Sequence, residues 1–178
     1  MSYDMRDYLK PRRLTIATWD IGYMVRRNEH DPFKDWDKAM DGLKERGFNT
    51  IRIDAFPGVI DPKNIDMEFT WPDVDQPLVP WMWINKYTSR PGRDLIEFIQ
   101  MAKRKGLYLI LTSWWFESVF IPADTMEAAQ LWINLLEVIK KEAGFDNILL
   151  VDFVNEIPGF LPGYEQQLEA AKSDENIA

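Results

Sequence analysis

Short apolar runs alternate with amphipathic stretches along this chain, and the alternation predicts its secondary structure. Apolar runs rich in branched residues indicate buried strands, and apolar residues spaced by three and four positions indicate helices. Strands and helices then follow one another in strict alternation. The predicted strands cover residues 14–19, 49–57, 107–112 and 147–156, and the predicted helices cover residues 32–46, 92–105, 124–143 and 164–172.

Local signals set the ends of the predicted helices. Asp31 and Pro32 predict the start of the first helix, because aspartate is a favoured N-cap and proline is favoured at the first helical position. Basic residues followed by Gly47 predict its end, and the same pattern recurs before Gly106. Gly144 ends the third predicted helix.

A long segment, residues 58–91, separates the second predicted strand from the second predicted helix. Loops of this length in compact domains are usually functional or poorly ordered. The segment is rich in aromatic residues, which favours an ordered structure. Two interpretations remain: a loop that folds over a functional site, or a small hydrophobic satellite cluster. The aromatic residues include Trp71, Trp81, Trp83 and Tyr87.

The alternating order predicts an α/β fold with a parallel sheet and right-handed crossovers. A doubly wound sheet and a (β/α)8 TIM barrel both meet this pattern. A doubly wound nucleotide-binding fold usually has a glycine-rich turn after its first strand, and residues 19–23 contain none. We therefore predict the first four βα units of a parallel (β/α)8 barrel, a half barrel in one domain over residues 1–178, with functional groups at the strand ends. The strand-end residues are Trp19, Asp20, Arg52, Asp54, Ser113, Trp114, Asn155 and Glu156.

The fourth predicted strand is an apolar run that ends in Asn155 and Glu156. A continuous apolar run suits a strand that is covered on both faces. Alternation places Asp152 and Glu156 on one face and Asn155 on the other. Two acids on an apolar face need partners. Either the Asn-Glu pair is functional, or it simply opens a surface loop.

Composition narrows the classes of partner. Hydrophobic residues make up 46% of the chain and aromatic residues 13%, which is typical of a globular protein. The net charge of -8 argues against nucleic acid and anionic membranes as partners. The absence of cysteine excludes disulfides and thiolate metal sites, and the single histidine, His30, excludes a histidine-rich metal site. We predict no metal and no cofactor.

The sequence has no stretch that is long and apolar enough to span a membrane. Residues 1–13 are polar and charged and lack the apolar region of a signal peptide. A cytoplasmic protein is the default expectation. Secretion remains compatible with the sequence if the chain is a fragment that has lost its signal peptide.

Two motifs link the chain to a known family. Residues 47–53, GFNTIRI, match a G-x-N-x-[IV]-R run that leads into a second strand, and residues 152–158, DFVNEIP, match an [ED]-x-x-N-E-x-P-like run at the end of a fourth strand. In these motifs, and in the order and spacing of its elements, the chain resembles the N-terminal half of the cellulase-like (β/α)8 glycoside hydrolases, whose acid/base lies on strand four. The resemblance covers nearly all 178 residues.

The resemblance implies roles for the matching residues. Glu156 would be the general acid/base, which protonates the leaving oxygen and then activates water. Asn155 would hydrogen-bond the 2-hydroxyl of the sugar. Arg52 would lie beneath the catalytic carboxylates and hold the nucleophile ionised, with Asp152 as a structural acid paired to it. The alternative for Arg52 is an ordinary salt-bridged arginine of the barrel.

The resemblance also implies a carbohydrate substrate, and tryptophans at strand ends are suited to stacking on sugar rings. Trp19 and Asp20 are predicted to bind substrate at the end of the first strand. Trp114 and Trp115 are predicted subsite platforms after the third strand, although one of them would only pack, because neighbouring side chains diverge.

The chain departs from the family pattern in three ways. The family nucleophile is a glutamate at the end of strand seven, and a retaining mechanism needs two carboxylates about 5 to 5.5 Å apart. No residue here takes that role by position. Many members have histidines near the ends of strands three and four, where this chain has residues 113–115, SWW. The family is also mostly secreted. We therefore expect a retaining hydrolase of β-linked oligosaccharides or glycosides in the intact protein, and an inactive 178-residue chain.

Three alternatives remain open. The first is a non-catalytic carbohydrate-binding TIM-barrel protein. The second is an unrelated barrel enzyme that holds a divalent metal with Asp20, Asp54 and Glu156. The third is a homodimer in which two half barrels complete one another. Unpaired edges at the first and fourth strands would in any case favour self-association.

Overall fold

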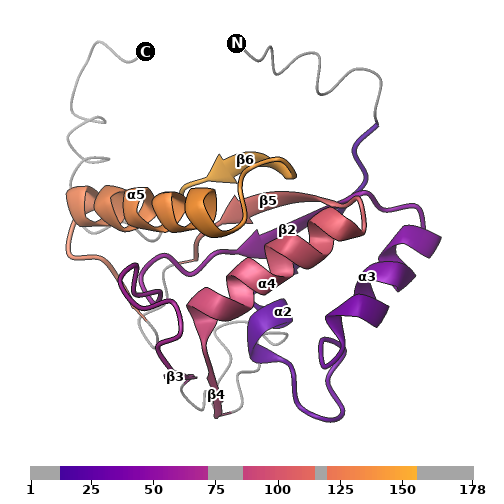
Figure 1. Ribbon diagram of the computed structural model, residues 1–178, viewed down its shortest axis with the longest axis horizontal. Helices are drawn as coiled ribbons and strands as arrows, with labels where there is room; N and C mark the ends of the chain where they lie inside the picture. The colour runs from indigo at the N-terminus through magenta and orange to yellow at the C-terminus, as the bar shows by residue number, and fades with distance from the viewer. Residues whose placement is uncertain (1–12, 72–85, 115–119, 156–178) are drawn as a thin grey trace, which may run out of the picture.

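The chain folds as a four-stranded parallel sheet with its long helices on one side (Figure 1). The computed structural model describes residues 13–71, 86–114 and 120–155. All neighbouring strands of this sheet run parallel, as the alternating order predicted. In spatial order the strands are β1 (Ile16–Asp20), β2 (Thr50–Asp54), β5 (Tyr108–Thr112) and β6 (Ile148–Asp152).

The register of the sheet aligns the carboxyl ends of its strands. Asp54 at the end of β2 is opposite Thr112 at the end of β5, and Thr112 is in turn opposite Asp152 at the end of β6. The pairing of β1 with β2 shifts between Thr18 and Asp20, which marks a bulge at the end of β1. Polar side chains that are far apart in the sequence therefore meet at one edge.

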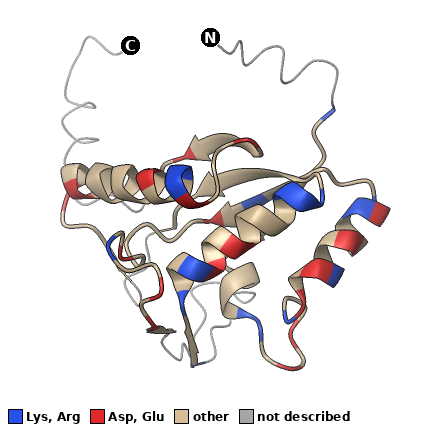
Figure 2. Ribbon diagram, viewed as in Figure 1, with Lys and Arg blue, Asp and Glu red and all other residues tan. Residues whose placement is uncertain are grey.

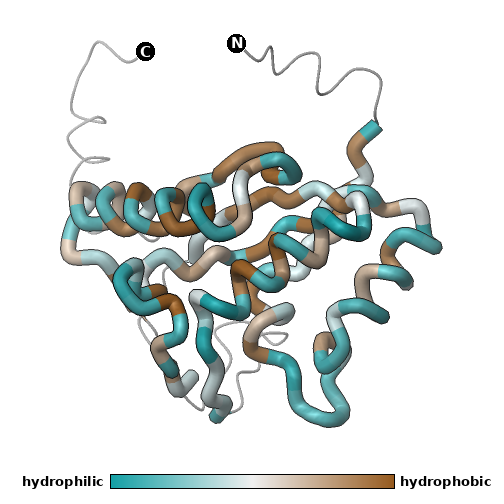
Figure 3. Tube along the Cα trace, in the orientation of Figure 1, coloured by the Kyte–Doolittle hydropathy of each residue, from teal (hydrophilic) through white to brown (hydrophobic). Residues whose placement is uncertain are grey.

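The two faces of the sheet differ in burial. Ile16 and Leu150 lie on the face away from the helices and are 44% and 46% exposed. The expectation that the fourth strand is covered on both faces is therefore wrong for the described part of the chain, because the helices cover only one side of the sheet. Figure 3 shows the hydrophobic positions concentrated on the strands and on parts of the helices. The wholly buried positions that face the helices are Ile51, Ile53, Leu109 and Leu111.

The helices of the described residues follow the predicted order, with one short addition, and the predicted helix at 164–172 lies outside those residues. The longest is α5 (Thr125–Glu142), and Asp124 caps it by accepting hydrogen bonds from two backbone N–H groups. The short α2 (Gly22–Val25) was not predicted, because a single buried turn is too short to show helical periodicity. None of the helices in the described ranges is long and apolar enough to cross a bilayer. The other helices are α3 (Trp36–Glu45) and α4 (Pro91–Arg104).

Helix α3 begins at Trp36, later than the predicted start at Pro32. Its N-cap is Asp35, whose side chain accepts a hydrogen bond of 3.0 Å from the backbone N–H of Lys38. Asp31 is not the cap: its carboxylate accepts a bond from a backbone N–H earlier in the same loop. The prediction was wrong because two aspartates compete as caps, and the local pattern does not rank them.

The long segment between β2 and α4 contains a two-stranded antiparallel ribbon of β3 (Phe69–Trp71) and β4 (Tyr87–Ser89). Trp71 is wholly buried, and its Nε1 donates to Ser89 Oγ at 2.9 Å. Its ring lies 4.7 Å from that of Phe56, in the loop after β2. Trp71 and Phe56 belong to the main hydrophobic core, and Phe69 and Tyr87 pack against it, so the described part of the segment does not form a separate satellite cluster. Trp81 and Trp83 lie outside the described residues.

Acidic and basic residues are distributed along the helices (Figure 2). Lys105 directly follows the end of α4. Its Nζ lies 2.9 Å from Asp37 and 2.6 Å from Asp41, so this amine joins the C-terminal end of α4 to α3. Such exposed pairs align neighbouring helices and contribute little to stability.

Substitution of Gly92 by alanine should destabilise the chain. A Cβ at this position in the first turn of α4 would lie 2.8 Å from the backbone oxygen of Ile65. Backbone cannot rotate away as a flexible side chain can, so we expect a loss of about 1 to 3 kcal/mol in the free energy of unfolding, measured by urea denaturation.

Gly42→Ala is the matched control for this substitution. A Cβ at Gly42, inside α3, would meet only the end of the Arg46 side chain at 3.8 Å. Alanine has the higher helix propensity, so this variant should gain about 0.5 to 1 kcal/mol. Equal effects of the two substitutions would contradict the close contact at Gly92.

Candidate active site at the strand ends

Arg52 is the centre of a polar network at the carboxyl ends of the four parallel strands. Its Nη1 lies 3.3 Å from Asp20 Oδ1, and its Nη2 lies 2.9 Å from Asp152 Oδ2. The same Nη2 donates to Thr112 Oγ1 at 3.2 Å and to Asn155 Oδ1. Thr112 Oγ1 in turn donates to Asp152 Oδ2 at 3.1 Å. One guanidinium therefore joins residues from β1, β5 and β6 and from the turn after β6.

The turn after β6 brings Asn155 to the same side as Asp152. Strict alternation predicted these residues on opposite faces, and that prediction is wrong, because Arg52 contacts both side chains. The strand ends at Asp152, and the backbone leaves strand geometry before Asn155. With Oδ1 of Asn155 turned to Arg52, its buried Nδ2 has no hydrogen-bond partner among the described residues.

Asp54 is a second strand-end acid, and it is wholly buried. Its Oδ1 accepts from the backbone N–H of Phe56 and its Oδ2 from that of Trp114, each at 2.7 Å. Burial raises the pKa of Asp54 from its ordinary value of 3.8 to about 8, although the two backbone hydrogen bonds act in the opposite direction. Its backbone oxygen accepts from Tyr23 Oη at 2.8 Å. Asp54 therefore connects the loops that follow β2 and β5.

Two non-glycine residues at this edge have a positive φ. Asp20 has a φ of 44° and Phe56 a φ of 50°. Such conformations cost free energy, and they persist where surrounding contacts hold them. At Asp20 the contact is the ion pair with Arg52, and burial raises the pKa of this carboxyl group while Arg52 lowers it.

The predicted aromatic platforms differ in their surroundings. Trp19 packs against Phe33, with ring centroids 4.9 Å apart, and against Phe98 at 6.0 Å. Trp114 is partly buried at the edge of the core, with its backbone N–H bound to Asp54. Trp115 and the predicted acid/base Glu156 lie outside the described residues. Their roles, and those of Trp19 and Trp114, stay predictions.

Within the described ranges, no group of three His, Cys, Asp or Glu residues is arranged to hold a metal ion. Asp20 contacts Arg52 and Asp54 binds backbone N–H groups, so both acids already have other partners. Thr112 is the member of the network that the sequence analysis missed. Its position at the end of its strand, opposite Asp152, is the signal that could have identified it.

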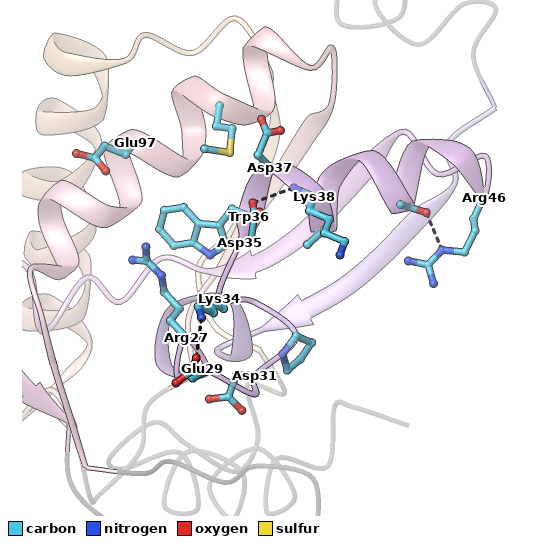
Figure 4. A pocket seen from close by; sticks show the side chains of 14 residues that line it. Arg27, Glu29, Asp31, Lys34, Asp35, Trp36, Asp37, Lys38, Arg46 and Glu97 are labelled. Atoms are coloured by element: carbon cyan, nitrogen blue, oxygen red, sulfur yellow. Dashed lines mark hydrogen bonds and ion pairs between the residues drawn. The ribbon is translucent and has the colours of Figure 1, made fainter.

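A large hollow lies elsewhere, between α3, α4 and the loop before α3 (Figure 4). Its volume is about 900 Å³, and it contains none of the Arg52 network. The Arg27 guanidinium lies 3.9 Å from the ring centroid of Trp36 and pairs with Asp94 at 3.2 Å. Both acidic and basic side chains line this hollow.

Comparison with known proteins identifies relatives of this chain. Residues 16–165 match the model of a family described as cellulase-like and sugar-binding. No curated protein matches the chain. Among solved structures, a putative glycoside hydrolase from Parabacteroides distasonis ATCC 8503 is similar, with 28% sequence identity and a TM-score of 0.72. The match covers 91% of this chain and 42% of that one.

Two structures of an endocellulase from Pyrococcus horikoshii are also similar. A complex with cellotetraose has 17% identity and a TM-score of 0.54, over 82% of this chain and 38% of that one. A second structure, of the hyperthermophilic enzyme, has 19% identity and a TM-score of 0.52, over 83% and 38%. The chain thus spans less than half the length of these relatives. The predicted half of a TIM-barrel fold is confirmed.

Proposed function

The chain belongs to the cellulase-like family of sugar-binding domains, and on this premise we propose that it is the N-terminal half of a glycoside hydrolase that acts on β-linked oligosaccharides or glycosides. The observation that carries the proposal is the Arg52 network. It gathers an arginine, two carboxylates and an amide at the carboxyl ends of parallel strands, where barrel enzymes place their chemistry.

The fixed orientation of the Asn155 side chain supports its proposed role. Its Oδ1 accepts from Arg52, so the side-chain amide is held in one orientation with Nδ2 as a free donor in the described part of the chain. This donor is buried in the described structure, so it would have to be uncovered before it could bind the sugar 2-hydroxyl, an interaction that strengthens in the transition state. Glu156 follows directly in the sequence and would be the general acid/base.

A retaining mechanism needs a second carboxylate about 5 to 5.5 Å from the first. Asp20 and Asp152 contact Arg52, and Asp54 is wholly buried. These positions suit structural acids rather than a nucleophile. We infer that the nucleophile would come from strands that complete the barrel over the open face at Ile16 and Leu150. The 178-residue chain alone would then bind sugar and not hydrolyse it.

The second candidate is a carbohydrate-binding protein without catalysis, and the description of the matched family as sugar-binding favours it. The two candidates differ in what they require of Glu156. A hydrolase needs this carboxyl group for turnover once the barrel is complete, whereas a binding protein needs only the aromatic and hydrogen-bonding groups of the site.

The test is calorimetric titration of the chain with cellotetraose, together with an assay for hydrolysis of an aryl β-cellobioside. We expect binding without hydrolysis. Trp114→Ala should weaken binding about tenfold or more, because truncation of an aromatic anchor commonly costs that much. Phe145→Ala is the control: Phe145 is exposed at the opposite end of the sheet, and its variant should bind normally.

Glu156→Gln separates the outcomes. Hydrolysis by the 178-residue chain that disappears in this variant would contradict the proposed inactivity and establish catalysis. Binding that is lost in Trp114→Ala and unchanged in Glu156→Gln is expected under both candidates, which differ only in whether the completed barrel turns substrate over. No binding of cellotetraose by the wild-type chain would count against both candidates for this sugar.

A further inference from the structure

Asp54 connects two loops through one buried carboxyl group. One oxygen accepts from the N–H of Phe56 in the loop after β2, and the other accepts from the N–H of Trp114 in the loop after β5. We propose that Asp54 is a positioning residue, which holds the peptide between Ser113 and Trp114 in the orientation that presents Trp114 and Asn155 to the sugar. This inference rests on the proposed function and adds a residue to that site.

The peptide between Ser113 and Trp114 is held from both sides. Its N–H donates to Asp54 at 2.7 Å, and its C=O accepts from the backbone N–H of Asn155 at 2.9 Å. In a trans peptide these two groups point in opposite directions. One peptide plane therefore lies between the end of β2 and the turn after β6. A rotation of this plane would break both bonds and would move Trp114 and Asn155 together.

A carboxyl group suits this position better than its isosteres. Both oxygens of aspartate can accept, also when one of them carries a proton, which matches the two backbone donors. Asparagine offers one acceptor, and its NH2 group would face an N–H donor. The bond to Phe56 also holds that residue at its φ of 50°. Serine could keep this local bond, as in an ST turn, but is too short to reach Trp114.

The burial of Asp54 argues for positioning rather than catalysis. The residue is wholly buried, so it cannot touch a bound sugar. Arg52, two positions earlier on the same strand, carries the contacts to Asp152 and Asn155. Asp54 would act only by holding the peptide between Ser113 and Trp114, which lies at the end of the neighbouring strand β5.

The experiment compares the backbone amide chemical shifts of the wild-type chain with those of Asp54→Asn and Asp54→Ser, and measures cellotetraose affinity for each. In Asp54→Ser we expect the Phe56 amide to stay near its wild-type shift while the amides of Trp114 and Asn155 move. Affinity should fall about tenfold or more in both variants, because small misplacements of binding groups are costly. The matched control is Asp61→Asn, since Asp61 Oδ1 accepts from Lys63 N at 2.8 Å with the same two-residue spacing and no second bond across strands.

Several results would overturn the proposal. One is a shift change confined to residues near Phe56, which would make Asp54 a local turn cap only. Another is unchanged affinity despite moved amides at Trp114 and Asn155. Failure of both variants to fold would assign Asp54 to folding instead of positioning. If the wild-type chain binds no cellotetraose, the proposed function fails for this sugar, and the amide shifts alone decide the role of Asp54.

Discussion

Arg52→Met should lower the free energy of unfolding by about 2 to 3 kcal/mol and abolish sugar binding. Methionine keeps much of the aliphatic length but removes every donor of the guanidinium. Asp20 and Asp152 would then face each other's charge without a cation between them. Hydrogen bonds to charged groups contribute about 1.5 to 3 kcal/mol each. The expected loss is near the lower end of the total for the two charged contacts of Arg52, because the side chains of Asp20 and Asp152 are 26% and 36% exposed and water screens them.

Urea denaturation and calorimetric titration would measure the two effects of Arg52→Met. The control is Arg93→Met, since Arg93 pairs with Asp66 at 2.8 Å on the surface, with side chains 35% and 49% exposed. Exposed pairs contribute little, so this variant should have nearly wild-type stability and affinity. If Arg52→Met were as stable as Arg93→Met, the network around Arg52 would not be the organising contact of the strand ends.

The stability of the chain should fall as the pH rises from about 4 to about 8, and Asp54 should be the main cause. Burial raises the pKa of Asp54 from 3.8 to about 8 in the folded state. A group whose pKa is raised by folding binds its proton more tightly in the folded state. Its contribution to stability is therefore complete below pH 3.8 and is lost as the pH rises through about 8. The steepest slope is about 1.4 kcal/mol per pH unit.

The difference between the wild-type chain and Asp54→Asn isolates this titration. Asparagine does not titrate, so the variant should lack most of the slope between pH 4 and 8. Asp20, whose pKa is also raised by burial, contributes in the same direction in both proteins and cancels in the comparison. Denaturation midpoints of both proteins, measured across this pH range, would show whether Asp54 causes the loss of stability. Parallel curves for the two proteins would show that Asp54 stays ionised throughout, with its two backbone donors outweighing burial.

Much of the fold was predictable because its determinants are local. The apolar run after Asn49 and the helical spacing of apolar residues in 92–105 identify β2 and α4 without reference to the rest of the chain. The glycines after the helices were equally visible: Gly47 and Gly106 have φ values of 83° and 68°, which other residues rarely adopt. The start of α3 was mispredicted because two aspartates have the same local signal.

The sequence by itself determined the order of the four parallel strands and of α3, α4 and α5, the polar residues at the strand ends, and the motif around Asn155 and Glu156. The tertiary structure decided which of these groups meet. Register brings Thr112 to Asp152 and Arg52, and the end of β6 at Asp152 lets Asn155 turn back to the same guanidinium. The physical reason is the distance along the chain over which each feature is determined. The periodicity of buried positions depends on residues that are close in the sequence. A hydrogen bond between strands depends instead on register, on where each strand ends and on what else the donors contact.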